Sequence, residues 1–137
     1  MEFLKKYLTT EGRLNRLRYL KYSLILGFGS LAVSVILSLI TALITGGDEN
    51  SFPVRAVMWV VYFFWFVGYL TLIIRRLHDL DKPEYLVAIV FLPQIASIIG
   101  INILITLGGI ANLAFGVYLL LAPGTKGKNQ YGADPLR

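Results

Sequence analysis

Three long stretches without a charged residue constrain the fold of this chain more than any other feature of its sequence. They cover residues 22–45, 56–74 and 85–122. About 20 apolar helical residues cross the hydrocarbon core of a bilayer, which is roughly 30 Å thick. Hydrophobic residues make up 56% of the chain, and the 15% that are charged gather between the apolar stretches. The sequence therefore predicts an all-α, polytopic integral membrane protein with a single membrane domain over 1–137.

The apolar stretches predict the membrane spans. The first two predict one span each, over 22–45 and 55–74. The third is about 57 Å long as one helix, nearly twice the core thickness. We expect it to form two spans over 85–100 and 103–122, with Pro93 kinking the first and a tight reversal near Gly100. The prediction is four transmembrane helices, or two plus a re-entrant hairpin.

The distribution of basic residues favours four spans over three, because Lys and Arg concentrate in cytoplasmic loops. Six lie in 1–21, three in 75–84 and three in 123–137, and only Arg55 lies between the first two spans. Four spans place these twelve residues on one side of the membrane. We therefore expect both termini to be cytoplasmic, with 1–21 acting as an uncleaved basic anchor and not as a signal peptide.

The terminal segments add local predictions. Residues 2–8 place apolar side chains opposite two lysines, a pattern that is typical of a short interfacial helix. Asn15 is a suitable N-cap for the helix that contains the first span. Residues 123–137 are turn-forming and cannot make a helix, but packing against the cytoplasmic loops can order them.

A short charged segment, residues 75–84, separates the second and third apolar stretches; we call it the charged island. It contains the only histidine of the chain, His78, directly before Asp79. We expect the island to be a cytoplasmic, membrane-surface loop. Adjacent residues on a helix do not face each other, so His78 and Asp79 are not expected to pair. Asp79 is instead expected to bind one of the two preceding arginines, and His78 to be held by Asp81 or Glu84.

Three hypotheses about the island remain open: a structural charge network, a binding site for an anionic headgroup or ligand, and a catalytic site. We expect the basic amino-terminal segment, the island and the tail to meet on one cytoplasmic surface, to which Asn129 and Asp134 also belong. The candidate lipid-binding or partner-binding residues are Arg13, Arg16, Arg75, Arg76, His78 and Asp79.

Catalysis is the least favoured of the three hypotheses, and metal and cofactor sites are not expected. The chain has no cysteine and one histidine, and it lacks the common nucleotide-binding, hydrolase and zinc-protease motifs. We therefore predict no enzyme, no metal and no cofactor. The net charge of +5 is better explained by anionic lipid than by nucleic acid, because the basic residues flank apolar spans.

Three motifs in this order resemble those of a known family. They are Gly12-Arg13-x-x-Arg16, Arg75-Arg76-Leu77-His78-Asp79, and Pro123-Gly124-Thr125 followed by Asn129-x-Tyr131-Gly132-x-Asp134-Pro135. The chain resembles the bacterial inner-membrane family called domain of unknown function 805. The resemblance implies a bacterial inner (plasma) membrane location and supplies no biochemical activity. The chain departs from the family where Lys-Pro-Glu-Tyr over 82–85 replaces a frequent glycine and tryptophan.

We expect a small inner-membrane protein of structural or regulatory function. Its basic cytoplasmic face would contact anionic lipid headgroups or a membrane partner protein, and the chain could form a homo-oligomer. The alternative is an oligomeric channel or small-solute transporter. Such proteins usually keep ionisable groups at membrane depth, whereas these spans offer only Gln94, Asn102 and Asn112 as strongly polar groups. A broken helix at Pro93 or at Gly108-Gly109 would best indicate a substrate site.

Overall fold

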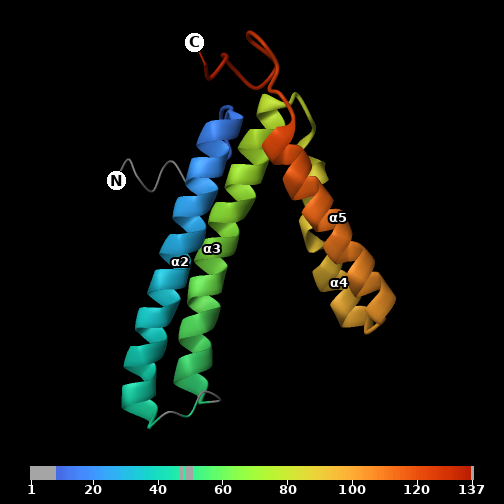
Figure 1. Ribbon diagram of the computed structural model, residues 1–137. Helices are drawn as coiled ribbons and strands as arrows, with labels where there is room; N and C mark the ends of the chain where they lie inside the picture. Colours follow the sequence, from blue (N-terminus) through green and yellow to red (C-terminus); the bar gives the residue numbers. More distant parts are fainter. Residues whose placement is uncertain (1–8, 47, 49–50, 137) are drawn as a thin grey trace.

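The computed structural model describes residues 9–46, 48 and 51–136 (Figure 1). These residues form helices and no strand, which confirms the all-α class for this part of the chain. The predicted interfacial helix over 2–8 lies outside the described residues. Three of the helices are long and apolar enough to cross a membrane, and η1 with α4 forms a shorter apolar segment. The elements are α2 (Arg16–Thr45), α3 (Phe52–Asp79), η1 (Glu84–Phe91), α4 (Leu92–Ile99) and α5 (Asn102–Leu121).

The first two long helices, α2 and α3, form an antiparallel hairpin (Figure 1). Helix α2 begins where predicted, because Asn15 Oδ1 accepts a hydrogen bond from the Arg18 backbone N–H at 2.9 Å. It ends at Gly46, whose φ of 67° is a left-handed conformation that glycine adopts without strain. The helices approach closely at Gly68 of α3, where an added Cβ would lie 3.1 Å from the Leu26 side chain.

A second hairpin is made of η1 and α4 on one arm and α5 on the other. Pro93 does not kink a continuous α-helix as expected; it lies in the first turn of α4, where the 3₁₀-helix η1 changes to an α-helix. Proline fits this position because the first helical turn needs no N–H at that residue. The chain reverses at Gly100, with a φ of 76°, as predicted. Gly108 allows the arms to touch, since a Cβ there would lie 3.0 Å from Pro93 N.

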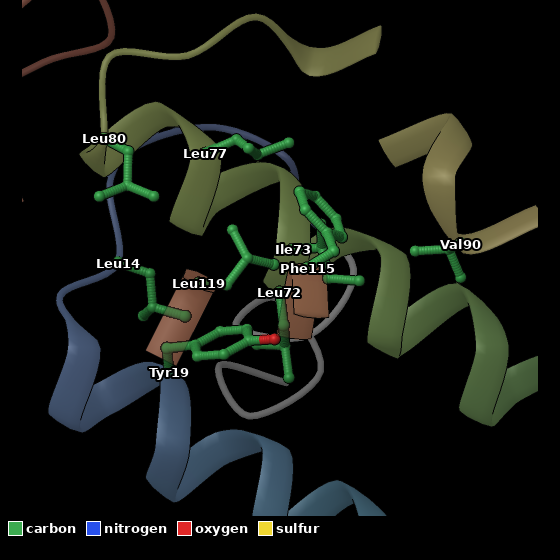
Figure 2. Close-up of a cluster of buried hydrophobic side chains, with 9 residues drawn as sticks. All are labelled: Leu14, Tyr19, Leu72, Ile73, Leu77, Leu80, Val90, Phe115 and Leu119. Atoms are coloured by element: carbon green, nitrogen blue, oxygen red, sulfur yellow. The ribbon is translucent and has the colours of Figure 1, made fainter. Parts of the chain in front are cut away.

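The two hairpins meet at one end and diverge toward the other (Figure 1). The buried apolar core lies at the joined end, where side chains of α3 meet those of α2, η1 and α5 (Figure 2). Away from this core most large apolar side chains are exposed, as expected of helices that face lipid. The core consists of Leu14, Tyr19, Leu72, Ile73, Leu77, Leu80, Val90, Phe115 and Leu119.

The charged island is not a loop throughout, in contrast to the prediction from the sequence. Helix α3 continues to Asp79, so only residues 80–83 connect it to η1. The helix continues because Leu72 and Leu77, on its last turns, are fully buried against Phe115 and Leu119 of α5 (Figure 2). Burial of these apolar side chains outweighs the polar composition of the last turn.

Candidate functional site: a buried polar junction

A cluster of buried polar side chains joins the amino-terminal segment, the end of α3 and the tail. We call it the polar junction and define it by Arg13, Arg76, His78, Asp79, Thr125 and Asn129. Three of its side chains, those of Arg13, Arg76 and Asp79, are between 0% and 2% exposed. Such burial of charge requires each group to be paired and hydrogen-bonded.

Asp79, the last residue of α3, is the centre of the junction. Its Oδ2 accepts a hydrogen bond from Nη1 of Arg76, which lies three residues earlier on the same helix. Its Oδ1 accepts from Nε of Arg13 at 3.2 Å. The sequence predicted a partner at Arg75 or Arg76, and the structure shows that it is Arg76. The second partner, Arg13, comes from a segment 66 residues away.

Arg76 also binds the end of α5. Its Nε donates to the Leu119 carbonyl at 2.7 Å, and its Nη2 donates to the Ala122 carbonyl at 2.5 Å. The last carbonyls of a helix have no partner within the helix, so the guanidinium replaces the missing N–H groups. One side chain therefore fastens α5 to α3 and satisfies a buried carboxylate.

Arg13 holds the tail in the same way. Its Nη1 donates to the Gly127 carbonyl at 2.6 Å, and its Nη2 donates to the Thr125 hydroxyl at 3.0 Å. The segment that carries Arg13 is itself fixed, because the Leu14 N–H donates to the Arg75 carbonyl at 3.0 Å. Arg13 thus links the amino-terminal segment to both α3 and the tail.

The tail packs directly on the end of α3, which confirms that it is ordered without being helical. The Thr125 backbone N–H and hydroxyl both donate to the Asp79 carbonyl, at 2.8 and 3.0 Å. Asn129 Nδ2 donates to the His78 carbonyl at 2.8 Å. Gly124 lies against the carboxylate, where an added Cβ would be 2.2 Å from Asp79 Oδ2. Only glycine permits this approach.

His78 forms the outer edge of the junction. Its Nδ1 lies 3.2 Å from the Gly12 carbonyl and its Nε2 lies 3.0 Å from Oε1 of Glu84, so Glu84 is the carboxylate that holds it. The other predicted candidate, Asp81, accepts from Gln130 Nε2 instead. Both ring nitrogens therefore face hydrogen-bond acceptors. The ring stacks on Tyr131 of the tail with centroids 3.9 Å apart.

The remaining predicted residues divide between the junction and its surroundings. Arg16 is exposed at the start of α2, and Arg75 is half-buried beside the junction. Asp134 supports the tail, since its Oδ2 accepts from the Gly127 N–H at 3.0 Å. Sequence reasoning did not single out Thr125 or Gly124 as parts of the site. The signal that marks them is the motif Pro123-Gly124-Thr125, whose role depends on contacts made far away in the sequence.

The junction is suited to holding the chain together. Its two guanidiniums and one carboxylate leave one positive charge, which six backbone carbonyls of the described residues help to stabilise. Charge-assisted hydrogen bonds of this kind are roughly twice as strong as neutral ones. A headgroup outside the protein would have to displace these internal acceptors to reach Arg13 or Arg76.

Comparison with known proteins places the chain in a family. Neither the curated proteins nor the solved structures gave a match. The model of the family described as "Protein of unknown function (DUF805)" matches residues 7–133, which include the first two motif segments and the third as far as residue 133. The chain, three of whose described helices are long and apolar enough to cross a membrane, therefore belongs to the DUF805 family of proteins of unknown function.

Proposed function

We propose that this chain is a small structural or regulatory protein of the bacterial inner membrane, with both termini cytoplasmic and a basic face that binds anionic lipid headgroups. The observation that carries the proposal is the division of its cations between two environments. Arg13 and Arg76 are buried and bound within the protein, whereas Arg16, Arg18 and Lys21 are exposed at the same end of the molecule. The exposed cations are the ones that a headgroup can reach.

The first turns of α2 have the composition of a membrane-surface anchor. Arg16, Arg18 and Lys21 alternate with Leu17, which is 70% exposed, and Leu20, which is 38% exposed. Apolar side chains there can enter the acyl region while the basic side chains reach the phosphates. The exposed Lys82, Lys126 and Lys128 add positive charge at the same end, and the exposed Glu11, Asp81 and Glu84 reduce it. The balance favours anionic lipid.

Replacing Arg16, Arg18 and Lys21 together by glutamine should weaken binding of phosphatidylglycerol. Each basic residue near an anionic surface contributes about 1 kcal/mol, so the triple variant is expected to lose at least about tenfold in affinity. Native mass spectrometry of the detergent-solubilised protein, titrated with phosphatidylglycerol, measures this loss. Phosphatidylcholine should bind equally to both proteins.

Arg55→Gln is the matched control for the triple variant, because Arg55 is an exposed cation at the other end of α3. It should leave phosphatidylglycerol binding unchanged, and the effect of the triple variant should shrink as salt is raised. Equal phosphatidylglycerol binding by the wild type and the triple variant would disprove the role of this face.

The topology predicts which positions can be labelled from outside the cell. The chain has no cysteine, so Asp48→Cys, Ile101→Cys and Lys128→Cys each introduce one thiol. The η1–α4 arm, about 28 Å long, and α5, about 30 Å, are each long enough for the hydrocarbon core. A membrane-impermeant maleimide should therefore label Asp48→Cys and Ile101→Cys in intact cells, and Lys128→Cys only after lysis. Labelling at Lys128→Cys in intact cells would refute the cytoplasmic tail, and protection of Ile101→Cys would indicate a re-entrant hairpin.

A further inference from the structure

Two adjoining pockets lie between α3 and the second hairpin, where the hairpins diverge in Figure 1. The inner pocket has a volume of 220 Å³ and is lined by aromatic side chains of α3 together with Gln94 of α4 and Asn112 of α5. The outer pocket, of 570 Å³, shares Tyr62 and Gln94 with it and reaches Arg55 near the start of α3.

In the proposed topology, the inner pocket lies near the middle of the membrane. Between Tyr69, which lines it, and Asp79 in the polar junction, α3 rises about 15 Å. Between Asn112 and Leu121, at the end of α5, the rise is about 14 Å. With the polar junction at the membrane surface, both residues lie about halfway through a hydrocarbon core of roughly 30 Å. Phospholipid headgroups stay at the surface and do not reach this depth.

Two carboxamides, those of Gln94 and Asn112, line the inner pocket. Within the described part of the chain, neither the Gln94 nor the Asn112 side chain makes a hydrogen bond, although both line the pocket. An amide placed in hydrocarbon without a hydrogen bond is strongly unfavourable. A partner that supplies hydrogen-bond acceptors from outside the protein would remove this cost.

The opposite wall of the pocket is a row of stacked aromatic rings on α3. Trp65 and Tyr69 stack with centroids 5.3 Å apart and planes 8° apart, and Tyr62 and Phe66 with centroids 5.9 Å apart and planes 14° apart. These pairs recur four residues apart, so their rings lie on one side of the helix. Because these rings stack on one another, the wall suits a flat ring through edge-to-face contacts.

The lining defines the chemistry of the occupant. No charged side chain lines the inner pocket, so the occupant is uncharged. A helix of a second copy, about 10 Å across, is too large for 220 Å³, and an acyl chain offers no acceptor to the amides. We propose that the inner pocket binds an uncharged, membrane-soluble planar ring that carries carbonyl groups, the chemistry of a quinone. Gln94 and Asn112 donate to its carbonyl oxygens, and the ring lies against the aromatic side chains of α3.

The two tryptophans of the chain allow a direct test, because Trp65 lines the inner pocket and Trp59 the outer one. In nanodiscs, Trp59→Phe protein is titrated with decylubiquinone, which quenches tryptophan fluorescence. Saturable quenching of Trp65 is expected. Asn112→Leu or Gln94→Leu in the same background should weaken the apparent affinity about tenfold, since each removes a hydrogen bond in an apolar site. Both variants should melt at or above the parent temperature, because leucine suits the membrane better than an amide.

Asn102→Leu is the matched control: it removes an exposed amide from the first turn of α5 and should not change the affinity.

Three outcomes would overturn the proposal. Quenching that rises linearly with quinone concentration, and equally in the Trp59→Phe parent and in the Asn112→Leu variant, would show that the inner pocket is not a binding site. Decylbenzene, which has no carbonyl, could displace the quinone equally well. Cross-linking of two chains through Gln94→Cys would show that the inner pocket is part of an interface between copies. Because the triple variant of the basic face should bind quinone normally, failure of one proposal does not imply failure of the other.

Discussion

Asp79→Asn should destabilise the protein by about 3–5 kcal/mol, because it leaves two buried arginines without their counter-ion. Arg13 and Arg76 both bind the Asp79 carboxylate, and their side chains are 1% and 0% exposed. Asparagine keeps the shape of the side chain and changes only its charge and one acceptor. Guanidinium unfolding in dodecylmaltoside, followed by tryptophan fluorescence, measures the change in the free energy of unfolding.

Asp81→Asn makes the same chemical change two residues later and is the matched control. Asp81 is exposed and accepts one hydrogen bond from Gln130 on the surface, so its replacement should change stability by no more than about 0.5 kcal/mol. If Asp79→Asn and Asp81→Asn were equally stable, the carboxylate could not be the centre of the junction.

Gly124→Ala should detach the tail from α3. A Cβ at this position would lie 2.2 Å from Oδ2 and 2.8 Å from Cγ of Asp79, a carboxylate held by two arginines that has no room to move away. Overpacking a well-packed site typically costs about 1–3 kcal/mol. The hydrogen bonds from Thr125 to Asp79 should break as well, so trypsin should cleave at Lys126 and Lys128 faster than in the wild type. Limited proteolysis with mass spectrometry measures that rate.

Gly116→Ala is the control for the added methyl group. Gly116 lies within α5, and an added Cβ there would meet no atom within 4 Å. Alanine favours a helix over glycine by about 1 kcal/mol, so this variant should be as stable as the wild type or more stable. Unchanged trypsin cleavage of Gly124→Ala would show that the tail does not depend on close packing against Asp79.

Much of the fold followed from local sequence patterns. The uncharged stretches predicted the helices, Asn15 predicted the start of α2, and Gly100 predicted the reversal between α4 and α5. These features depend on residues close together in the sequence, which is why they could be predicted. The continuation of α3 to Asp79 was missed, because it depends on burial of Leu77 against α5 and not on the polar composition of the island.

The candidate site was predicted only in part. The sequence placed Asp79 beside one of two arginines and His78 beside one of two carboxylates, because helix geometry limits such pairs to short separations. It could not distinguish buried from exposed arginines. Arg13 and Arg16 belong to the same motif, yet Arg13 is buried against Asp79 and Arg16 faces outward.

The sequence by itself determined that this chain is helical and membrane-embedded, and that its charges concentrate between the spans. Those properties follow from composition and from the free energy of placing each segment in lipid. Only the tertiary structure decided which charges hold the protein together. Asp79 gains its second arginine from the amino-terminal segment and its backbone partner from Thr125 in the tail, 46 residues further on. Contacts over such separations depend on how the hairpins pack, and no local pattern encodes them.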